Sequence, residues 1–305
     1  MVALPATIVV AAVIWILLTP WSAEGTAALF VVLISTIILR QLSNSLQLIR
    51  VRSWAVSSVF VLLAGVCYSL HQWSLMAAAM GLLYLIHMTG LLYSYQAKRP
   101  QNHILLAFIA LSLMTMAQPA FACLLPVSIM AMAVHLRTLT AKSFVAIFFG
   151  LLLPYEVWAA WHIYNGTIAQ ALTDWGTQFT DFAVPQIQTD GPLPDLLYAN
   201  LWQQGRLAII VLFIYGLIGL FHFIRTSYND KISTRMHYYT IILEWPVLMA
   251  LLIFMPTHTN LMALPLIMAG SPILAHYMVF AKGWAGNLFF WLFIALCLFL
   301  VLPIF

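Results

Sequence analysis

The sequence predicts an all-α fold, a polytopic transmembrane helical bundle of about eleven spans that forms one integral membrane domain over residues 1–305. Two observations predict this class. Apolar residues make up 64% of the chain and charged residues only 7%, whereas soluble domains carry about 25% charged residues. The apolar residues also gather in separate runs, each long enough to cross a hydrocarbon core about 30 Å thick. This composition cannot cover a soluble surface.

A run becomes a predicted span when about 20 consecutive residues are mostly apolar. The first run resembles a signal peptide, but no Lys or Arg precedes it, so we expect a retained helix with a cytoplasmic N-terminus. Counting every run as one crossing then places the C-terminus outside. The predicted spans cover residues 3–19, 25–40, 54–70, 74–95, 103–118, 120–136, 143–163, 206–224, 237–255, 260–280 and 286–304.

The 12 Lys and Arg residues, apart from Arg206, all lie in alternate gaps between these spans. Basic residues beside span ends face the cytoplasm, so this alternation predicts a multi-pass protein of the bacterial inner (cytoplasmic) membrane. The net charge of +4 is then explained by orientation and by anionic lipids, which makes the lipid bilayer the expected partner and excludes nucleic acid. The predicted cytoplasmic gaps are residues 40–52, 98–99, 137–142, 225–235 and 282.

The apolar run from 103 to 136 is interrupted at Gln118 and Pro119 and could form one long helix or two. Basic residues flank both of its ends, so both ends should face the cytoplasm and the chain must cross an even number of times. We therefore expect a hairpin that turns at Pro119. The run is short for two complete crossings at a rise of about 1.5 Å per residue, so one or both helices should stop short of the outer face.

The longest gap, residues 164–204, lies on the predicted outer side. Its apolar residues recur at the spacing of one helix face, and we expect an amphipathic helix in the outer membrane interface. A segment that only caps the helical bundle would show the same pattern. Prolines between residues 185 and 194 should break regular structure after this helix. The apolar face would consist of Ile168, Leu172, Trp175, Phe179 and Phe182.

The predicted outer side also holds most of the acidic residues. Carboxylates there could act as general bases or as cation ligands. The exclusion of Lys and Arg would equally leave an acidic outer face without any chemical role, so both explanations stay open. The five acids concerned, out of eight in the chain, are Glu24, Asp174, Asp181, Asp190 and Asp195.

Two further carboxylates, Glu156 and Glu244, fall inside spans, where an ionisable group is costly and therefore suggests a function. Each lies near a proline, Pro154 or Pro246, whose missing amide leaves a backbone carbonyl without its donor. A protonated Glu could donate to such a carbonyl. A direct pair is disfavoured, because the two lie about 20 Å and 11 Å from the inner ends of their spans at 1.5 Å per residue. The alternative is two glutamates beside kinks without a chemical role.

No metal site and no soluble cofactor are expected. Cys67, Cys123 and Cys297 lie in apolar runs without metal-ligand spacing. The nine histidines form no His-x-x-x-His pair, and those inside spans, such as His87 and His276, should be buried with a hydrogen-bond partner. Phosphate- and dinucleotide-binding motifs are also missing from the sequence.

Residues 101–165 carry a family resemblance. They contain Ala117-Gln118-Pro119-Ala120, Leu124-Leu125-Pro126, a basic turn at Arg137 and Lys142, Gly150-Leu151-Leu152-Leu153-Pro154 and Trp161-His162-Ile163-Tyr164-Asn165. This stretch resembles the middle of the C-type glycosyltransferases, membrane enzymes that transfer a sugar from a polyprenyl-phosphate carrier on the outer face. Over nearly its whole length the chain is also similar to an uncharacterised family of bacterial integral membrane proteins of about this length.

The resemblance implies a polyprenyl-phosphate-linked sugar as the donor and a catalytic carboxylate in the first outer loop. That loop is short here, from Thr19 to Gly25, and Glu24 is its one acid. Glu24 would deprotonate an acceptor hydroxyl while Asp174 or Asp181 positions it. The loop has no second acid to help bind a metal, which also fits a catalytically reduced relative.

Three functions therefore stay open, and with them the question whether the protein is an enzyme. The first is a C-type-glycosyltransferase-like protein for a polyprenyl-linked sugar. The second is a transporter or lipid flippase that uses Glu156 and Glu244 beside kinked helices. The third is a noncatalytic assembly subunit of an envelope complex, held by a fixed protein partner.

Overall fold

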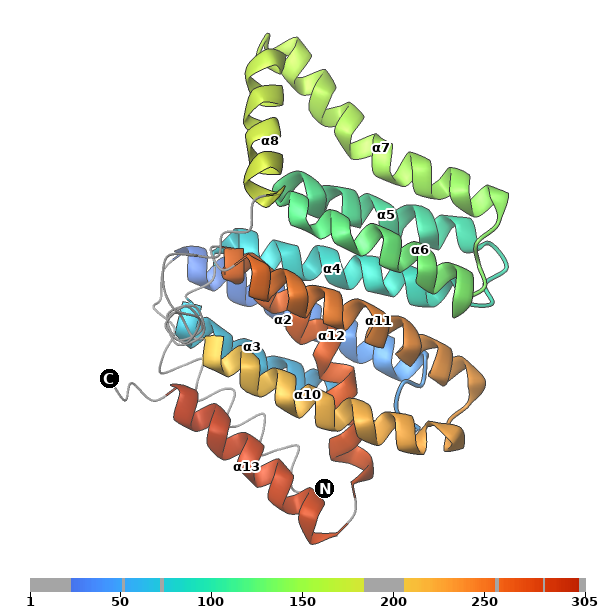
Figure 1. The fold of residues 1–305 in the computed structure, drawn as a ribbon, viewed down its shortest axis with the longest axis vertical. Helices are drawn as coiled ribbons and strands as arrows, with labels where there is room; N and C mark the ends of the chain where they lie inside the picture. Colours follow the sequence, from blue (N-terminus) through green and yellow to red (C-terminus); the bar gives the residue numbers. More distant parts are fainter. Residues whose placement is uncertain are drawn as a thin grey trace. The chain divides into compact units, whose positions relative to one another are not determined.

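The computed structural model describes residues 23–50, 53–71, 74–183, 206–255, 258–281 and 283–301. Within these ranges the regular structure is helical and contains no strand (Figure 1). The predicted span 3–19, the prolines of residues 185–194, Asp190 and Asp195 lie outside the described residues. The predicted all-α class is confirmed.

Each predicted span from residue 25 onward coincides with a described helix, and an additional helix follows α7 in the long gap. The helices end close to the predicted bounds because the apolar runs themselves are well separated. They are α2 (Ala23–Ser45), α3 (Ala55–His71), α4 (Leu75–Ser94), α5 (Pro100–Ala117), η1 (Pro119–Cys123), α6 (Leu124–Val134), α7 (Ala141–Tyr164), α8 (Ile168–Ala183), α10 (Arg206–Thr226), η3 (Ser227–Asn229), α11 (Ile232–Phe254), α12 (Thr259–Phe280) and α13 (Trp284–Val301).

Six helices in the described part of the chain are long and apolar enough to cross a membrane, namely α2, α4, α5, α7, α11 and α12. Shorter apolar helical stretches cover Ala55–Cys67, Pro119–Val134 and Gly286–Phe299. The chain is therefore a multi-pass integral membrane protein. The count of eleven crossings and the orientation stay predictions.

The helices belong to two compact units, each described by itself below. Unit 1 comprises Met1–Leu82, Gln188–Tyr238 and Thr259–Phe305, and unit 2 comprises Leu83–Ile187 and Tyr239–His258. The boundaries fall inside α4 and α11, so each of these helices contributes residues to both units. The single domain stays a prediction.

The core of unit 1 is built around α12. Every residue from Met262 to His276 is buried, as expected for a helix that is apolar on all sides. Helices α3 and α10 pack against it. A Cβ on Gly219 of α10 would lie only 2.8 Å from the carbonyl oxygen of Ile273, so this glycine lets the two backbones approach closely.

In unit 2, α5 packs along α7 and against the second part of α4. A Cβ on Gly90 of α4 would lie 2.7 Å from the carbonyl oxygen of His103, so this approach also depends on a small residue. Between α5 and α7, the hydroxyl of Ser112 donates to the carbonyl oxygen of Leu151 at 2.8 Å. Close packing of small residues and interhelical hydrogen bonds are the interactions expected to join helices inside a bilayer.

The predicted hairpin at Pro119 is confirmed. Gln118, with φ −148° and ψ 106°, is extended and separates α5 from η1 and α6. The ring of His87 lies between the two arms, 2.9 Å from the carbonyl oxygen of Ala107 and 3.0 Å from the hydroxyl of Ser128. One imidazole can contact both residues only if the chain turns back between them. With 11 residues, α6 spans about 16 Å and is shorter than the hydrocarbon core.

The predicted amphipathic helix in the long gap is present as α8, which turns back from the end of α7 and packs on η1 (Figure 1). Ala171 is buried, and the ring of Trp175 contacts that of Tyr155, with centroids 5.8 Å apart. Leu172, expected on the apolar face, is 52% exposed. Ala171 and Trp175 thus pack on the protein and Leu172 does not, and the location of α8 in the outer membrane interface stays a prediction. The side chains of Phe179 and Phe182 lie outside the described residues.

Candidate functional site

The most completely enclosed carboxylate in the described residues is Glu244, near the middle of α11, with no exposed surface. The hydroxyl of Tyr84 donates to its Oε2 atom at 2.9 Å. Its Oε1 atom lies 3.4 Å from the hydroxyl of Ser128 and 3.5 Å from Nε2 of His87. These four residues, all in unit 2 and all without exposed surface, are called the Glu244 cluster here.

Three helices supply the cluster. Tyr84 and His87 are three residues apart on α4, a spacing that places both side chains on one face of a helix. Ser128 comes from α6, where its hydroxyl also lies 2.8 Å from the carbonyl oxygen of Leu124. Glu244 comes from α11, which stays helical through Pro246. Glu244 is thus enclosed by helices that are far apart in the sequence.

The hydrogen bonds of the cluster limit where its protons can lie. The carbonyl oxygen of Ala107 can only accept, so Nδ1 of His87 carries a hydrogen. If the Ser128 hydrogen points to Leu124, then Nε2 of His87 must also carry one, and an imidazolium faces a carboxylate. If the Ser128 hydrogen points to Nε2, the imidazole is neutral. The cluster then holds the same number of protons when Glu244 carries one. The two arrangements differ in the position of the proton that His87 and Glu244 share and in the direction of the Ser128 hydroxyl.

Both arrangements leave the cluster without net charge, which suits a site enclosed inside a membrane protein. Loss of the shared proton would leave one uncompensated negative charge, and burial of such a charge costs several kcal/mol or more. A proton shared by Glu244 and His87 therefore keeps this enclosed group of side chains without net charge.

The second intramembrane carboxylate of the sequence, Glu156, has different surroundings. It lies exposed on α7 and makes no hydrogen bond or ion pair with any described residue. Its neighbours along the same exposed side include Leu153 and Val157. The structure thus does not bring Glu156 and Glu244 together, and neither of them donates to a carbonyl released by its proline among the described residues.

The acids predicted for the outer side are exposed where they are described. Oε1 of Glu24 accepts a hydrogen bond from the backbone amide of Leu75 at 3.2 Å, so Glu24 caps the start of α4. Asp174 is exposed on α8. These two acids belong to different units. The side chain of Asp181 lies outside the described residues, as do Asp190 and Asp195.

A second buried polar group lies in unit 1, where Nε of Arg50 donates to Oδ1 of Asp230 and His276 Nε2 lies 3.4 Å from Oδ2. Lys231, the residue after Asp230, donates to the side chain of Gln47 in the loop after α2 at 2.7 Å. These bonds join the loop after α2 to the turn between α10 and α11. The charge of Asp230 is therefore compensated by Arg50.

In the described residues, no three His, Cys, Asp or Glu side chains lie close enough to hold a metal ion. The histidine prediction is confirmed for His87, which is buried and hydrogen-bonded at both ring nitrogens. Sequence reasoning did not single out Tyr84 or Ser128. Their one available signal was the presence of Tyr84 and His87 at helical spacing inside an apolar run.

Comparison with protein-family models, curated proteins and solved structures found no match for this chain. The resemblance to C-type glycosyltransferases therefore stays a prediction.

Proposed function

We propose that the protein is a proton-linked membrane transporter in which Glu244 is the proton-carrying group. The single observation that supports this proposal is the full enclosure of Glu244 beside His87 in the middle of apolar helices. Ionisable groups at membrane depth are rare, and in transporters they mark proton and substrate pathways. Glu156 has no comparable partners among the described residues, so we assign it no part in proton transfer.

The proposed mechanism follows from the proton count of the cluster. With its proton, the cluster is neutral and stays enclosed. When the helices open toward one side, water or a cationic substrate stabilises the carboxylate and the proton leaves. His87 accepts or returns that proton, while Tyr84 and Ser128 hold the carboxylate in place. Because the charged form is costly when enclosed, proton release is tied to opening.

The test is proton movement in proteoliposomes that contain a pH-sensitive dye and are offered mixtures of candidate solutes. We expect solute-dependent proton flux with the natural chain and its loss in Glu244→Gln, which keeps the size and hydrogen-bonding shape of the side chain. Glu156→Gln is the matched control and should retain flux. Loss of flux in Glu156→Gln with full flux in Glu244→Gln would overturn the proposal.

A second candidate function is the handling of a polyprenyl-linked sugar at the outer face, as the resemblance implies. It is favoured by one observation, the amphipathic helix α8 with Asp174 exposed on it. Glu24→Gln is a suitable test, because the amide oxygen can still accept the bond from Leu75 while the carboxylate is lost. Unchanged surface glycan in this variant, in a strain that requires the gene, would exclude Glu24 as a catalytic base. If Glu24→Gln and Glu244→Gln are both silent, a noncatalytic assembly subunit becomes the better explanation.

We also propose the topology on which both functions depend: a bacterial inner membrane protein of eleven spans with its basic gaps in the cytoplasm. Reporter fusions at Gln188 and Asn229 test it. The fusion at Gln188 should report the outer side and that at Asn229 the cytoplasm. The same compartment for both fusions would contradict the orientation.

A further inference from the structure

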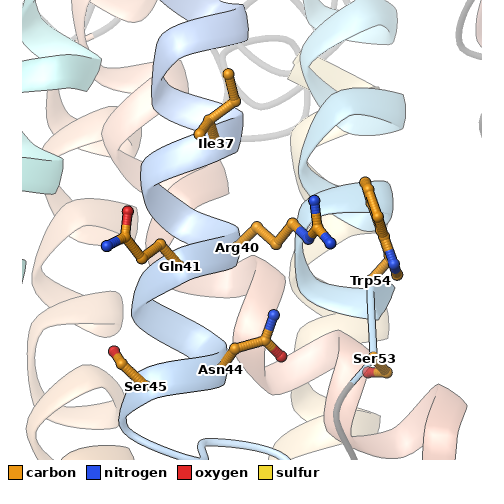
Figure 2. A pocket seen from close by; sticks show the side chains of 7 residues that line it. All are labelled: Ile37, Arg40, Gln41, Asn44, Ser45, Ser53 and Trp54. Atoms are coloured by element: carbon orange, nitrogen blue, oxygen red, sulfur yellow. The ribbon is translucent and has the colours of Figure 1, made fainter.

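A pocket of about 600 Å³ lies between the last turns of α2 and the start of α3, within unit 1. Figure 2 shows Arg40 reaching from α2 toward Trp54, with Asn44 beneath it and Ser53 beside the start of α3. The pocket is lined by Ile37, Arg40, Gln41, Asn44, Ser45, Ser53 and Trp54. Most of these side chains can donate hydrogen bonds, and none is acidic.

Arg40 is the charged group of this pocket. Its guanidinium lies over the ring of Trp54, with Cζ 3.2 Å from the ring centroid, a contact that orients the group without neutralising it. In the described part of the chain Arg40 forms no ion pair with an acid. Arg50, by contrast, is already paired with Asp230. The donors of Arg40 are therefore available to an anion.

The two helix ends at the pocket have opposite effects on an anion. The end of α2 at Ser45 presents carbonyl groups, whereas the start of α3 presents backbone amides, of which that of Ala55 donates to the hydroxyl of Ser53 at 3.4 Å. Each end is equivalent to about half a charge, of opposite sign, so the two roughly cancel. The full positive charge of Arg40 then makes the electrostatic potential in the pocket positive. A planar guanidinium with several donors matches the oxygens of a phosphate group.

The side of α2 that leads to the pocket is apolar and exposed. Phe30, Leu33, Ile34 and Ile37 are 65%, 47%, 49% and 65% exposed, and they precede Arg40 at the spacing of one helix face. An acyl chain can lie along this face while its headgroup reaches Arg40. Trp54, which is 49% exposed, is of the residue type that concentrates at the headgroup level of membranes. A free phosphate would use the pocket but not this apolar face.

We propose that this pocket binds the phosphate headgroup of an anionic phospholipid, with Arg40 as the main phosphate ligand and the exposed face of α2 as the contact for an acyl chain. Asn44 and Ser53, which lie on the same side as Arg40 in Figure 2, supply further donors. Basic pockets beside membrane helices are a known means of recognising anionic lipids. This site is independent of the Glu244 cluster and of the proposed transport activity.

The test is native mass spectrometry of the purified full chain, titrated with phosphatidylglycerol or with phosphatidylcholine. Both lipids contain a phosphate, but the choline headgroup is neutral overall. We expect the natural chain to prefer phosphatidylglycerol about tenfold, as one charge-assisted contact implies. Arg40→Gln should lower this preference to about one, and Arg40→Lys should keep part of it because a point charge remains.

The matched control is Arg99→Gln, since Arg99 is exposed, lies in another predicted cytoplasmic gap and is not part of the pocket. It should keep the full preference. An equal loss in Arg99→Gln, or an unchanged preference in Arg40→Gln, would overturn the proposal. Inorganic phosphate is added as a competitor. If it binds in an Arg40-dependent way as tightly as phosphatidylglycerol, the ligand is free phosphate and the lipid assignment is wrong.

Trp54→Phe is a second, milder variant. It tests the same contact in case Arg40→Gln alters the local structure. Phenylalanine retains the ring but is a weaker cation–π partner than tryptophan. The preference for phosphatidylglycerol should fall by a smaller factor than in Arg40→Gln. No change in Trp54→Phe together with no change in Arg40→Lys would count against the proposed geometry.

Discussion

The middle of α11 around Glu244 and the second half of α7 around Glu156 are both apolar helical stretches with one glutamate and one proline. Around Glu244, side chains from α4 and α6 complete a polar cluster without exposed surface. Around Glu156, the neighbours Val157 and Trp161 are 63% and 65% exposed, and no described residue bonds to the carboxylate. The difference shows that a glutamate beside a proline becomes a chemical site only when other helices bring polar partners to it.

The two stretches differ because α7 is held mainly by its first half and by the turns around Pro154. Gly150 contacts α5 closely, Ser112 donates to the carbonyl oxygen of Leu151, and Thr115 lies 3.0 Å from the hydroxyl of Tyr155. The residues beyond Tyr155 are largely exposed up to Tyr164. Whether a side chain is enclosed thus depends on where helices pack. The same residue types therefore have different surroundings on the two sides of the contact between α7 and α5.

The largest expected effect is the loss of stability in Glu244→Ala. Truncation of this buried side chain leaves Tyr84 and His87 without their partner and opens a cavity, which together typically cost about 2 to 5 kcal/mol. Glu156→Ala should not lower the free energy of unfolding, because no described residue bonds to the carboxylate and alanine suits an apolar span at least as well. Denaturant titration in mixed micelles measures both values. Equal effects at the two positions would remove the contrast between the two stretches.

A smaller effect is expected from Gly90→Ala in α4. The new methyl group would lie 2.7 Å from the backbone oxygen of His103 and 2.8 Å from Cβ of Ala107, so α4 and α5 must separate near the carbonyl that accepts from His87. Overpacking of this kind costs about 1 to 3 kcal/mol. Gly176→Ala in α8 is the control, since nothing lies within 4 Å of a Cβ there, and it should be neutral or slightly stabilising. Thermal unfolding in detergent compares the pair, and a more harmful Gly176→Ala would contradict the packing described.

The smallest of the expected effects distinguishes two tyrosine hydroxyls. Tyr84→Phe leaves Oε2 of Glu244 buried without its donor, which should cost about 1 to 2 kcal/mol. Tyr155→Phe removes a part-buried contact with Thr115, whose hydroxyl keeps its bond to the carbonyl oxygen of Ser112 at 2.8 Å, so its cost should be below about 1 kcal/mol. Denaturant titration again gives both values. A greater cost for Tyr155→Phe would place the more important polar contact on α7 and refute the assignment to α11.

Much of the fold was predictable from local features. The apolar runs gave the helices from residue 25 onward, and the interruption at Gln118 and Pro119 gave the hairpin between α5 and α6. The periodicity of residues 168 to 182 gave α8. These predictions succeed because helix length, apolarity and the lack of a proline amide act within a few residues. Which side chains of α8 pack on the protein was not predictable, because this depends on what η1 and α7 present: Trp175 contacts Tyr155, whereas Leu172 is exposed.

The candidate site was predictable only in part. The sequence by itself determined that the chain is a helical membrane protein, that Glu156 and Glu244 lie inside apolar helices, and where the basic residues gather, because these are properties of composition and order. Only the tertiary structure decided that Glu244 meets Tyr84, His87 and Ser128 while Glu156 stays exposed, and that Arg40 lies on the ring of Trp54 at the edge of a pocket. Those contacts join residues on different helices. Their distances depend on how side chains of several helices pack together, which no local pattern of the sequence specifies.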